Sequence, residues 1–330
     1  MTDTVSTHSL VVPRTGDSSV LSVQECEVAA PGPGELRVEV AATGVNFIEV
    51  YQRQGVYPLR LPFVLGSEGA GTVESVGDGV DLRVGERVAW AAAPGSAAGF
   101  VRMPASAAVP VPDGLALETA AAAMLQGITA HYLVTSTYAV QPGDTVLAHA
   151  VAGGVGQLLV QMVKARGARL VGTAGSAAKV DKALALGADH VIDYSGLDTD
   201  ALAAAVREAN DGEGVHVVYD GVGRTTFDAS LKALRRRGLL VLFGAASGQV
   251  PPFAIQRLNA GGSLFLTRPT MGDYIATRQE LTWRAGEVLG ALASGALTIE
   301  VGGRYPLVEA AKAYDDLEGR RTTGKLLLLP

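Results

Sequence analysis

The chain has 330 residues, of which 48% are hydrophobic and 18% charged, with a formal net charge of −6. This length predicts two domains with ample core, and the acidic balance argues against a nucleic-acid partner. No apolar run reaches the roughly 20 residues that a membrane span requires, and a polar start and a single cysteine, Cys26, favour a reducing cytoplasm.

The first third of the chain, residues 8–115, has the pattern of many short strands. Residues 36–40 and 71–76 alternate apolar and polar side chains with period two. Glycine- and proline-rich turns lie at 31–34 and 77–79. We therefore expect a twisted, mostly antiparallel β domain, followed by an alanine-rich helix at 118–135 that leads into a second domain.

From Gln141 the pattern changes to strands that alternate with helices. Strand candidates lie at 145–150, 169–173, 190–193, 215–219, 239–243 and 263–267. Helix candidates lie at 155–166, 177–186, 198–209 and 225–235, and Gly167 and Gly187 stand where helices end. This order predicts a doubly wound parallel sheet. A helix near 273–294 and a strand at 326–329 follow, and the strand is expected to return to the first domain.

The segment 146–157 is the most informative in the chain. An apolar strand stops at a glycine-rich turn, and a helical pattern follows at once. Free N–H groups and the helix dipole at such a terminus attract a pyrophosphate, and glycine lets the main chain approach it. A tight turn without a ligand is the alternative, but the context favours a dinucleotide held by Gly153, Gly154, Val155 and Gly156.

The next strand indicates which dinucleotide binds. Residues 168–176 end without the Asp or Glu that an NAD site places near the ribose hydroxyls, and Lys179 follows. A small, uncharged strand end beside a cation suits a 2′-phosphate, with Gly175 and Ser176 as backbone and hydroxyl donors. We therefore expect NADPH as the cofactor.

Several motifs in order resemble one family. They lie at 44–48 with Tyr51, 65–71, 84–88, 152–156, 182–189, 219–223, 243–244 and 319–325. As a set they resemble the zinc-independent quinone oxidoreductases, the zeta-crystallin-like branch of the medium-chain dehydrogenase/reductases. Val151 departs from a strict G-x-G-x-x-G pattern, but the A-x-x-G-x-x-G pattern of this family matches Ala150, Gly153 and Gly156.

The resemblance implies an α/β architecture of two domains. A GroES-like β-rich catalytic domain would comprise 1–126 and 269–330, and an inserted Rossmann domain 127–268. It also implies a homodimer in which the last Rossmann strand, 263–267, pairs with its copy. Such pairing would cover an apolar edge strand that is otherwise prone to aggregation.

The resemblance also assigns cofactor contacts. Lys179, Tyr194 and Arg320 are expected around the 2′-phosphate, where charge-assisted bonds are strong. Alone, Lys179 would be a solvated helix residue and Tyr194 a core aromatic. Ligands also gather at the carboxyl ends of strands in such sheets, so the residues expected on the nicotinamide side are Thr129, Gly221, Phe243, Gly244, Leu266 and Thr267. Phe243 is almost as well explained as ordinary core.

Asn46 and Tyr51 are the catalytic candidates that the resemblance implies. Zinc alcohol dehydrogenases of this superfamily have a metal-binding cysteine at the position of Asn46 and a histidine at that of Ser67. Neither ligand is present, and the five histidines are scattered, so no metal is expected. The Asn46 amide and the Tyr51 hydroxyl would then polarise the acceptor. A turn or cap role for Asn46 and a packed ring for Tyr51 are the alternatives.

Other carboxylates and Gln126 are harder to assign. Glu39 and Glu49 are expected to serve surface charge or local structure, whereas Glu68 lies in a motif that would face the active site. Gln126 replaces a lysine that related enzymes often have, which would either weaken contacts with a polar ligand or have no effect.

Three functions fit these observations. The first is NADPH-dependent reduction of a quinone. The second is reduction of the C=C bond of an enone or enal by the same cofactor. The third belongs to another class: an NADPH-binding structural or RNA-associated protein of the crystallin type, against which the acidic balance and the lack of a basic stripe argue.

Overall fold

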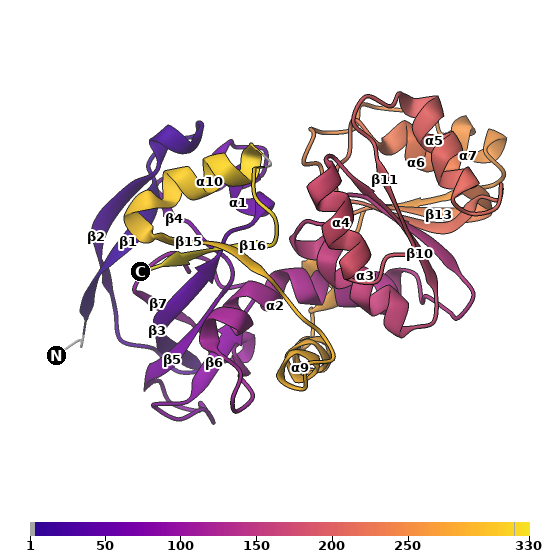
Figure 1. The fold of residues 1–330 in the computed structure, drawn as a ribbon. Coiled ribbons are helices and arrows are strands. Elements are labelled where there is room, and N and C mark those ends of the chain that lie inside the picture. The colour runs from indigo at the N-terminus through magenta and orange to yellow at the C-terminus, as the bar shows by residue number, and fades with distance from the viewer. Residues whose placement is uncertain (1–3, 320) are drawn as a thin grey trace. The chain divides into compact units, whose positions relative to one another are not determined.

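The computed structural model describes residues 4–319 and 321–330, which form two compact units. Residues up to Ile128 and from Ile275 onward belong to the first unit, and Thr129–Tyr274 form the second. The early indigo and late yellow segments in Figure 1 therefore belong to the same unit, because the chain enters the second unit once and leaves it once.

Strands of the first unit form two sheets. One sheet has the order β2-β1-β4, and the other has the order β15-β16-β3-β5-β6-β8, with β7 also paired to β3. The strands are β1 Val5–Val12, β2 Ser22–Val28, β3 Glu35–Gly44, β4 Phe63–Val64, β5 Gly69–Val76, β6 Arg87–Trp90, β7 Phe100–Pro104, β8 Val109–Pro110, β15 Val301–Pro306 and β16 Lys325–Leu329. Most neighbours are antiparallel, as the alternating segments predicted. The last strand, β16, pairs with β3 and so returns to this unit.

Helices of the first unit pack beside these sheets. They are η1 Ser18–Val20, α1 Phe47–Arg53, η2 Ala105–Ala107, α9 Arg278–Ala293, η4 Leu307–Glu309 and α10 Ala310–Glu318, while α2 Leu117–Tyr132 runs into the second unit. Val50 of α1 and Tyr314 of α10 share a buried apolar cluster with Leu326 and Leu328 of β16. This cluster fixes α1 against the C-terminal strand by apolar burial.

The second unit contains a parallel sheet with the order β11-β10-β9-β12-β13-β14. Its elements are η3 Leu133–Thr137, β9 Thr145–Ala148, α3 Gly154–Ala165, β10 Arg169–Ala174, α4 Ala177–Ala185, β11 His190–Asp193, α5 Thr199–Glu208, β12 Val215–Asp220, α6 Phe227–Ala233, β13 Leu234–Leu242, α7 Gln256–Ala260, β14 Phe265–Thr267 and α8 Met271–Tyr274. The strand order reverses between β9 and β12, which is the switch point where such sheets bind ligands. The predicted doubly wound fold is confirmed.

Two predicted elements differ in their bounds. The helix predicted at 225–235 ends at Ala233, because β13 already begins at Leu234 and pairs there with β12. The helix predicted at 273–294 is split into α8 and α9. Thr277 begins α9 through a capping box, in which its hydroxyl accepts from Glu280 N–H and the Glu280 carboxylate accepts in return.

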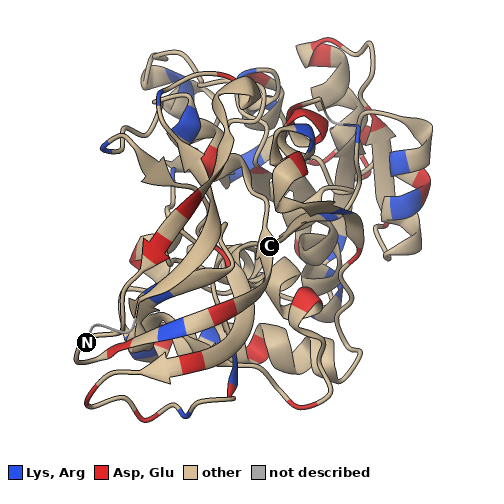
Figure 2. Cartoon of the chain, turned by 90° about the vertical axis from the view of Figure 1, so that its left-hand side faces the viewer, with Lys and Arg blue, Asp and Glu red and all other residues tan. Residues whose placement is uncertain are grey.

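Charge is distributed along both units. Figure 2 shows Lys and Arg interspersed with Asp and Glu on strands, helices and loops. Within the described residues, no helix combines the length and hydropathy needed to cross a membrane.

Candidate active site

The turn after β9 has the close packing that the glycine pattern predicted. Ala150 adopts φ 56°, and its carbonyl accepts the N–H of Gly153 at 2.9 Å. A Cβ at Gly156 would lie 2.3 Å from the Ala150 oxygen, so only glycine fits there. The first backbone bond into α3 is Gln157 N–H to the Gly153 carbonyl. The preceding N–H groups, of Gly154, Val155 and Gly156, are therefore those that a helix start offers to a phosphate.

The end of β10 brings together most of the residues predicted at the 2′-phosphate. A Cβ at Gly175 would lie 3.7 Å from the Tyr194 hydroxyl, so the Tyr194 ring lies beside this glycine. Ser176 begins α4, and Lys179 follows in the first turn of that helix with its side chain half-buried. The site has glycine, hydroxyl and ammonium groups, which are the chemistry that a phosphate monoester requires. Arg320 lies outside the described residues.

A second group of predicted residues gathers at the ends of β12 and β13. The Phe243 ring packs on Gly221, where a Cβ would lie 2.8 Å from the ring. A Cβ at Gly244 would lie 2.5 Å from the Gly221 oxygen, so both turns need glycine. Leu266 and Thr267 lie on β14, which pairs with β13. Thr129 is buried in α2, at the start of this unit.

A buried polar chain that the sequence reasoning missed links the strand ends beneath these turns. His149 contacts the Thr173 hydroxyl at 2.8 Å through Nδ1 and the Ser230 hydroxyl at 2.9 Å through Nε2. Ser230 donates to Asp220, whose carboxylate also accepts the N–H groups of residues 222 and 223. Burial lowers the pKa of His149, so its ring is neutral at pH 7. These bonds fix the ends of β9, β10 and β12 relative to one another.

In the first unit, Asn46 lies at the start of α1 and is almost fully buried. Its Nδ2 donates to Glu68 Oε2 at 2.8 Å and to the Gly44 carbonyl at 3.2 Å. Its backbone N–H donates to the Glu49 carboxylate at 2.5 Å. The cap position, which was the alternative for Asn46, is thus where the structure places it, and both amide hydrogens already have acceptors.

A lysine from the last strand completes this cluster. Lys325 Nζ lies 2.6 Å from Asn46 Oδ1 and 2.6 Å from Glu68 Oε2. Both ion-pair side chains have 0% exposure, and Glu68 Oε1 accepts the Leu125 N–H at 2.6 Å. A Cβ at Gly44 would lie 2.1 Å from Glu68 Oε2, so this glycine makes room for the carboxylate. The cluster fixes the orientation of the Asn46 amide.

Tyr51 lies on the same helix, half-buried and surrounded by aromatic rings. Its ring centroid is 5.6 Å from that of Tyr57, edge-on, and 6.3 Å from that of Phe47. The Tyr51 ring is therefore packed against other aromatic rings, which was the alternative role, and a catalytic role of its hydroxyl stays a prediction. Gln126 follows Leu125 in α2, and its buried Oε1 has no hydrogen-bond partner among the described residues.

The sequence around Lys325 already indicates that this lysine is unusual. A lysine directly before four apolar residues of a strand, 326–329, either faces solvent or is paired in the interior. Asp220 likewise ends an apolar strand. Their partners are far away along the chain, however, so spacing alone does not identify them.

The described residues around Asn46 do not include a set of metal ligands. Across the described ranges, no group of three or more His, Cys, Asp or Glu side chains is placed to hold a metal ion. Glu68, the carboxylate that accepts from the Asn46 side-chain amide, is already paired with Lys325.

Comparison with known proteins agrees with this architecture. Residues 32–113 match the family model described as alcohol dehydrogenase GroES-like domain, and residues 154–283 match the one described as zinc-binding dehydrogenase. A quinone oxidoreductase of Salmonella typhimurium is 44% identical over 320 residues, covering 96% of this chain and 97% of its own length. A 2-haloacrylate reductase of a Burkholderia species is 40% identical, with 97% and 98% covered.

Solved structures give the same result. Escherichia coli quinone oxidoreductase complexed with NADPH is 41% identical, with a TM-score of 0.95 over 98% of this chain and 100% of its own. A mycobacterial protein complexed with NADPH is 50% identical, with a TM-score of 0.95 and the same coverage. The predicted GroES-like and Rossmann combination is confirmed, and the chain belongs to the quinone oxidoreductase family of the medium-chain dehydrogenase/reductases.

Proposed function

We propose that this protein is an NADPH-dependent quinone reductase. The observation that supports this most directly is the glycine turn at Gly153–Gly156 together with an uncharged strand end, where Tyr194 lies beside Gly175 and Lys179 lies in the first turn of the next helix. Similar structures that bind NADPH support the same cofactor. The residues present fit it, because the N–H groups of Gly154, Val155 and Gly156 lie at the start of α3, where a helix offers N–H groups to a phosphate.

When bound, NADPH supplies the hydride that reduces the acceptor. The protein orients the reactants and excludes water. Asn46 and Tyr51 are proposed to donate hydrogen bonds to the acceptor oxygen. An acceptor would replace the longer Asn46 bond, the one to Gly44 at 3.2 Å, and Tyr51 or water would supply the proton.

We further propose that no zinc takes part, that the protein is cytoplasmic and that it forms a homodimer. The carboxylate beside Asn46 is neutralised by Lys325, which removes an incentive for a cation to bind there. A dimer through 263–267 is supported by β14, an edge strand on which Phe265 is 59% exposed.

A second candidate is reduction of an activated C=C bond. The similarity to a 2-haloacrylate reductase favours it, since that substrate is an α,β-unsaturated acid. Hydride from the same cofactor would then reach a β-carbon instead of a quinone.

Steady-state oxidation of NADPH distinguishes the candidates. The purified protein is assayed side by side with benzoquinones, naphthoquinones, small enones and 2-haloacrylate. We expect the highest kcat/KM with a quinone. Turnover of enones or haloacrylate alone would support the second candidate. Tight NADPH binding with no consumption of any acceptor would instead support a structural role.

A further inference from the structure

Glu49 is a buried carboxyl group that the reduction chemistry does not use. It lies on α1, one turn after Asn46, and its side chain is fully buried. Oε2 accepts the Asn46 N–H at 2.5 Å and the Tyr314 hydroxyl at 3.4 Å. Oε1 is also buried, and it has no hydrogen-bond partner within the described part of the chain. An acceptor without a donor in the interior is unfavourable for the ionised form.

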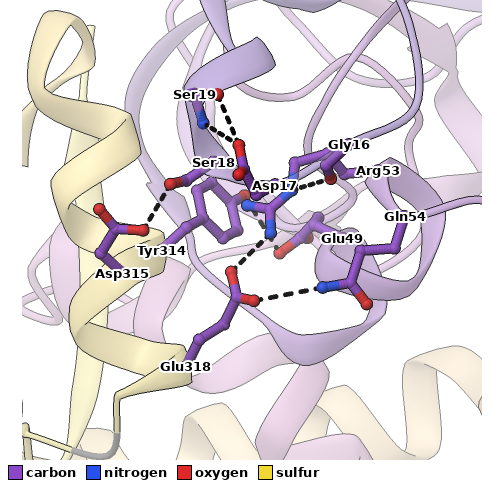
Figure 3. A network of polar contacts seen from close by, with 10 residues as sticks. All are labelled: Gly16, Asp17, Ser18, Ser19, Glu49, Arg53, Gln54, Tyr314, Asp315 and Glu318. Carbon is purple, nitrogen blue, oxygen red and sulfur yellow. Dashed lines mark hydrogen bonds and ion pairs between the residues drawn. The ribbon is translucent and has the colours of Figure 1, made fainter.

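A buried donor atom with no partner among the described residues lies one turn further along α1, on Arg53. Arg53 is fully buried, and Figure 3 shows its guanidinium beside the Tyr314 ring and above the Glu318 carboxylate. Its Nη2 binds Glu318 at 2.6 Å, and its Nε donates to the Gly16 carbonyl at 3.2 Å. Its Nη1 has no partner among residues that the structure describes. Residues 49 and 53 share a helix face, so a buried donor and a buried acceptor of complementary charge lie on one side of α1.

The groups that face Glu49 come from four places in the first unit. Lys325 of β16 favours its ionised form, and Glu68 opposes it. Tyr314 of α10 donates from the other side, and Arg53 lies over the Tyr314 ring at 5.7 Å. Burial is the largest influence, and it raises the pKa of Glu49 to about 8. Glu49 is therefore mainly protonated at pH 7, and the arrangement in Figure 3 fits its neutral form.

We propose that Glu49 is a positioning residue whose proton controls how α1 holds Asn46 and Tyr51 for the reduction. With Glu49 neutral, Oε1 tolerates the lack of a donor and Arg53 remains on Glu318. When the proton leaves to solvent, the bond to Asn46 N–H becomes charge-assisted and Oε1 requires a donor. Arg53 Nη1, the buried donor without a described partner one turn along the same helix face, would supply it. The guanidinium would then turn away from Glu318, which holds the end of α1, and the helix that carries both catalytic candidates would shift.

This inference rests on the proposed function, in which Asn46 and Tyr51 face the acceptor. The test is the pH profile of kcat between pH 6 and 9.5, with saturating NADPH and the preferred acceptor. In the wild-type enzyme we expect kcat to fall at least threefold as pH rises through about 8. Glu49→Gln keeps an acceptor for Asn46 N–H but cannot ionise, so its profile should lack this fall. Glu39→Gln, at an exposed position on β3, is the matched control and should keep it.

A second measurement does not depend on activity or on a variant. Carbon-13 NMR of the wild-type protein with labelled glutamate gives the pKa of the Glu49 carboxyl directly. We expect it to coincide with the inflection in kcat. An unchanged fall of kcat in Glu49→Gln, or a Glu49 pKa far from the kinetic inflection, would overturn the proposal.

The NADPH KM provides the remaining distinction. It should stay within twofold in Glu49→Gln, because the residues predicted to hold NADPH, apart from Arg320, lie in the other unit. A large rise in KM with an unchanged kcat profile would contradict a positioning role. If no quinone is reduced at all, the proposed function fails, whereas a Glu49 titration near pH 8 observed by NMR is unaffected by that failure.

Discussion

Replacing Lys325 by methionine should destabilise the first unit strongly. The ammonium lies 2.6 Å from both Glu68 Oε2 and Asn46 Oδ1, and neither member of the ion pair is exposed. Methionine retains most of the side-chain volume but leaves the Glu68 carboxylate buried without its cation. Removing one partner of such a pair costs roughly 3–5 kcal/mol. Since native proteins have about 5–15 kcal/mol of stability in total, we expect a large fraction to be lost.

The chain provides a control that differs mainly in burial. Arg304 lies 2.6 Å from Glu118, and the two side chains are 50% and 38% exposed. Arg304 is on β15, the strand that pairs with β16. Its replacement by methionine should cost less than about 1 kcal/mol, because exposed ion pairs are screened by water. The N–O distance is the same in both pairs, so the difference between the two losses reflects mainly the burial of the Lys325 cluster.

Urea unfolding monitored by tryptophan fluorescence measures both losses. Both tryptophans, Trp90 and Trp283, belong to the first unit, so the signal reports the unit that contains Lys325. Adding Glu68→Gln to Lys325→Met should recover much of the lost stability, because the uncompensated charge is then removed. Equal losses for Lys325→Met and Arg304→Met, or no recovery in the double variant, would refute the reasoning.

Three further predictions concern the cofactor and the metal. Lys179→Ala should raise the NADPH KM roughly tenfold or more, as expected for a lost bond to a charged group. The NADH KM should change less than about twofold, because NADH has no 2′-phosphate. Equal effects on both cofactors would exclude the assigned role of Lys179. Gly156→Ala should abolish NADPH binding in calorimetry, because its Cβ would lie 2.3 Å from the Ala150 oxygen, whereas Gly153→Ala, with a 3.1 Å contact, should be milder. Dialysis against a chelator should leave quinone turnover unchanged, and activity that is lost there and restored by zinc would contradict a metal-free site.

The sequence was sufficient to predict the doubly wound fold because its signals are local. Apolar strands, glycine turns and helix ends recur within a few residues of one another, as at Gly153–Gly156 before α3. The break between α8 and α9 was also local: Thr277 and Glu280 have capping-box spacing, which the wider helical pattern of 273–294 concealed. The predicted bounds of this helix were wrong because a capping box starts a new helix inside a segment whose apolar pattern looks continuous.

The candidate site was predictable only where its residues adjoin such local signals. Gly175 and Tyr194 meet because they end neighbouring parallel strands, and the strand order places them together. Lys325 meets Asn46 across 279 positions of sequence, and no pattern within a window contains both. The roles of Asn46 and Tyr51 stay predictions, because they depend on bound molecules.

The geometry of α1 depends on these long-range polar bonds more than on helix propensity. α1 has seven residues, and a helix this short is marginal by itself. Its start is held by the Asn46 cluster, and its end is held by Arg53 through Glu318 and Gly16. Apolar packing of Val50 fixes the helix in the unit but is less sensitive to direction than a hydrogen bond. It follows that substitutions in the two polar networks that leave no buried charge unpaired should alter turnover before they unfold the protein, since the catalytic candidates lie on the element that these networks orient.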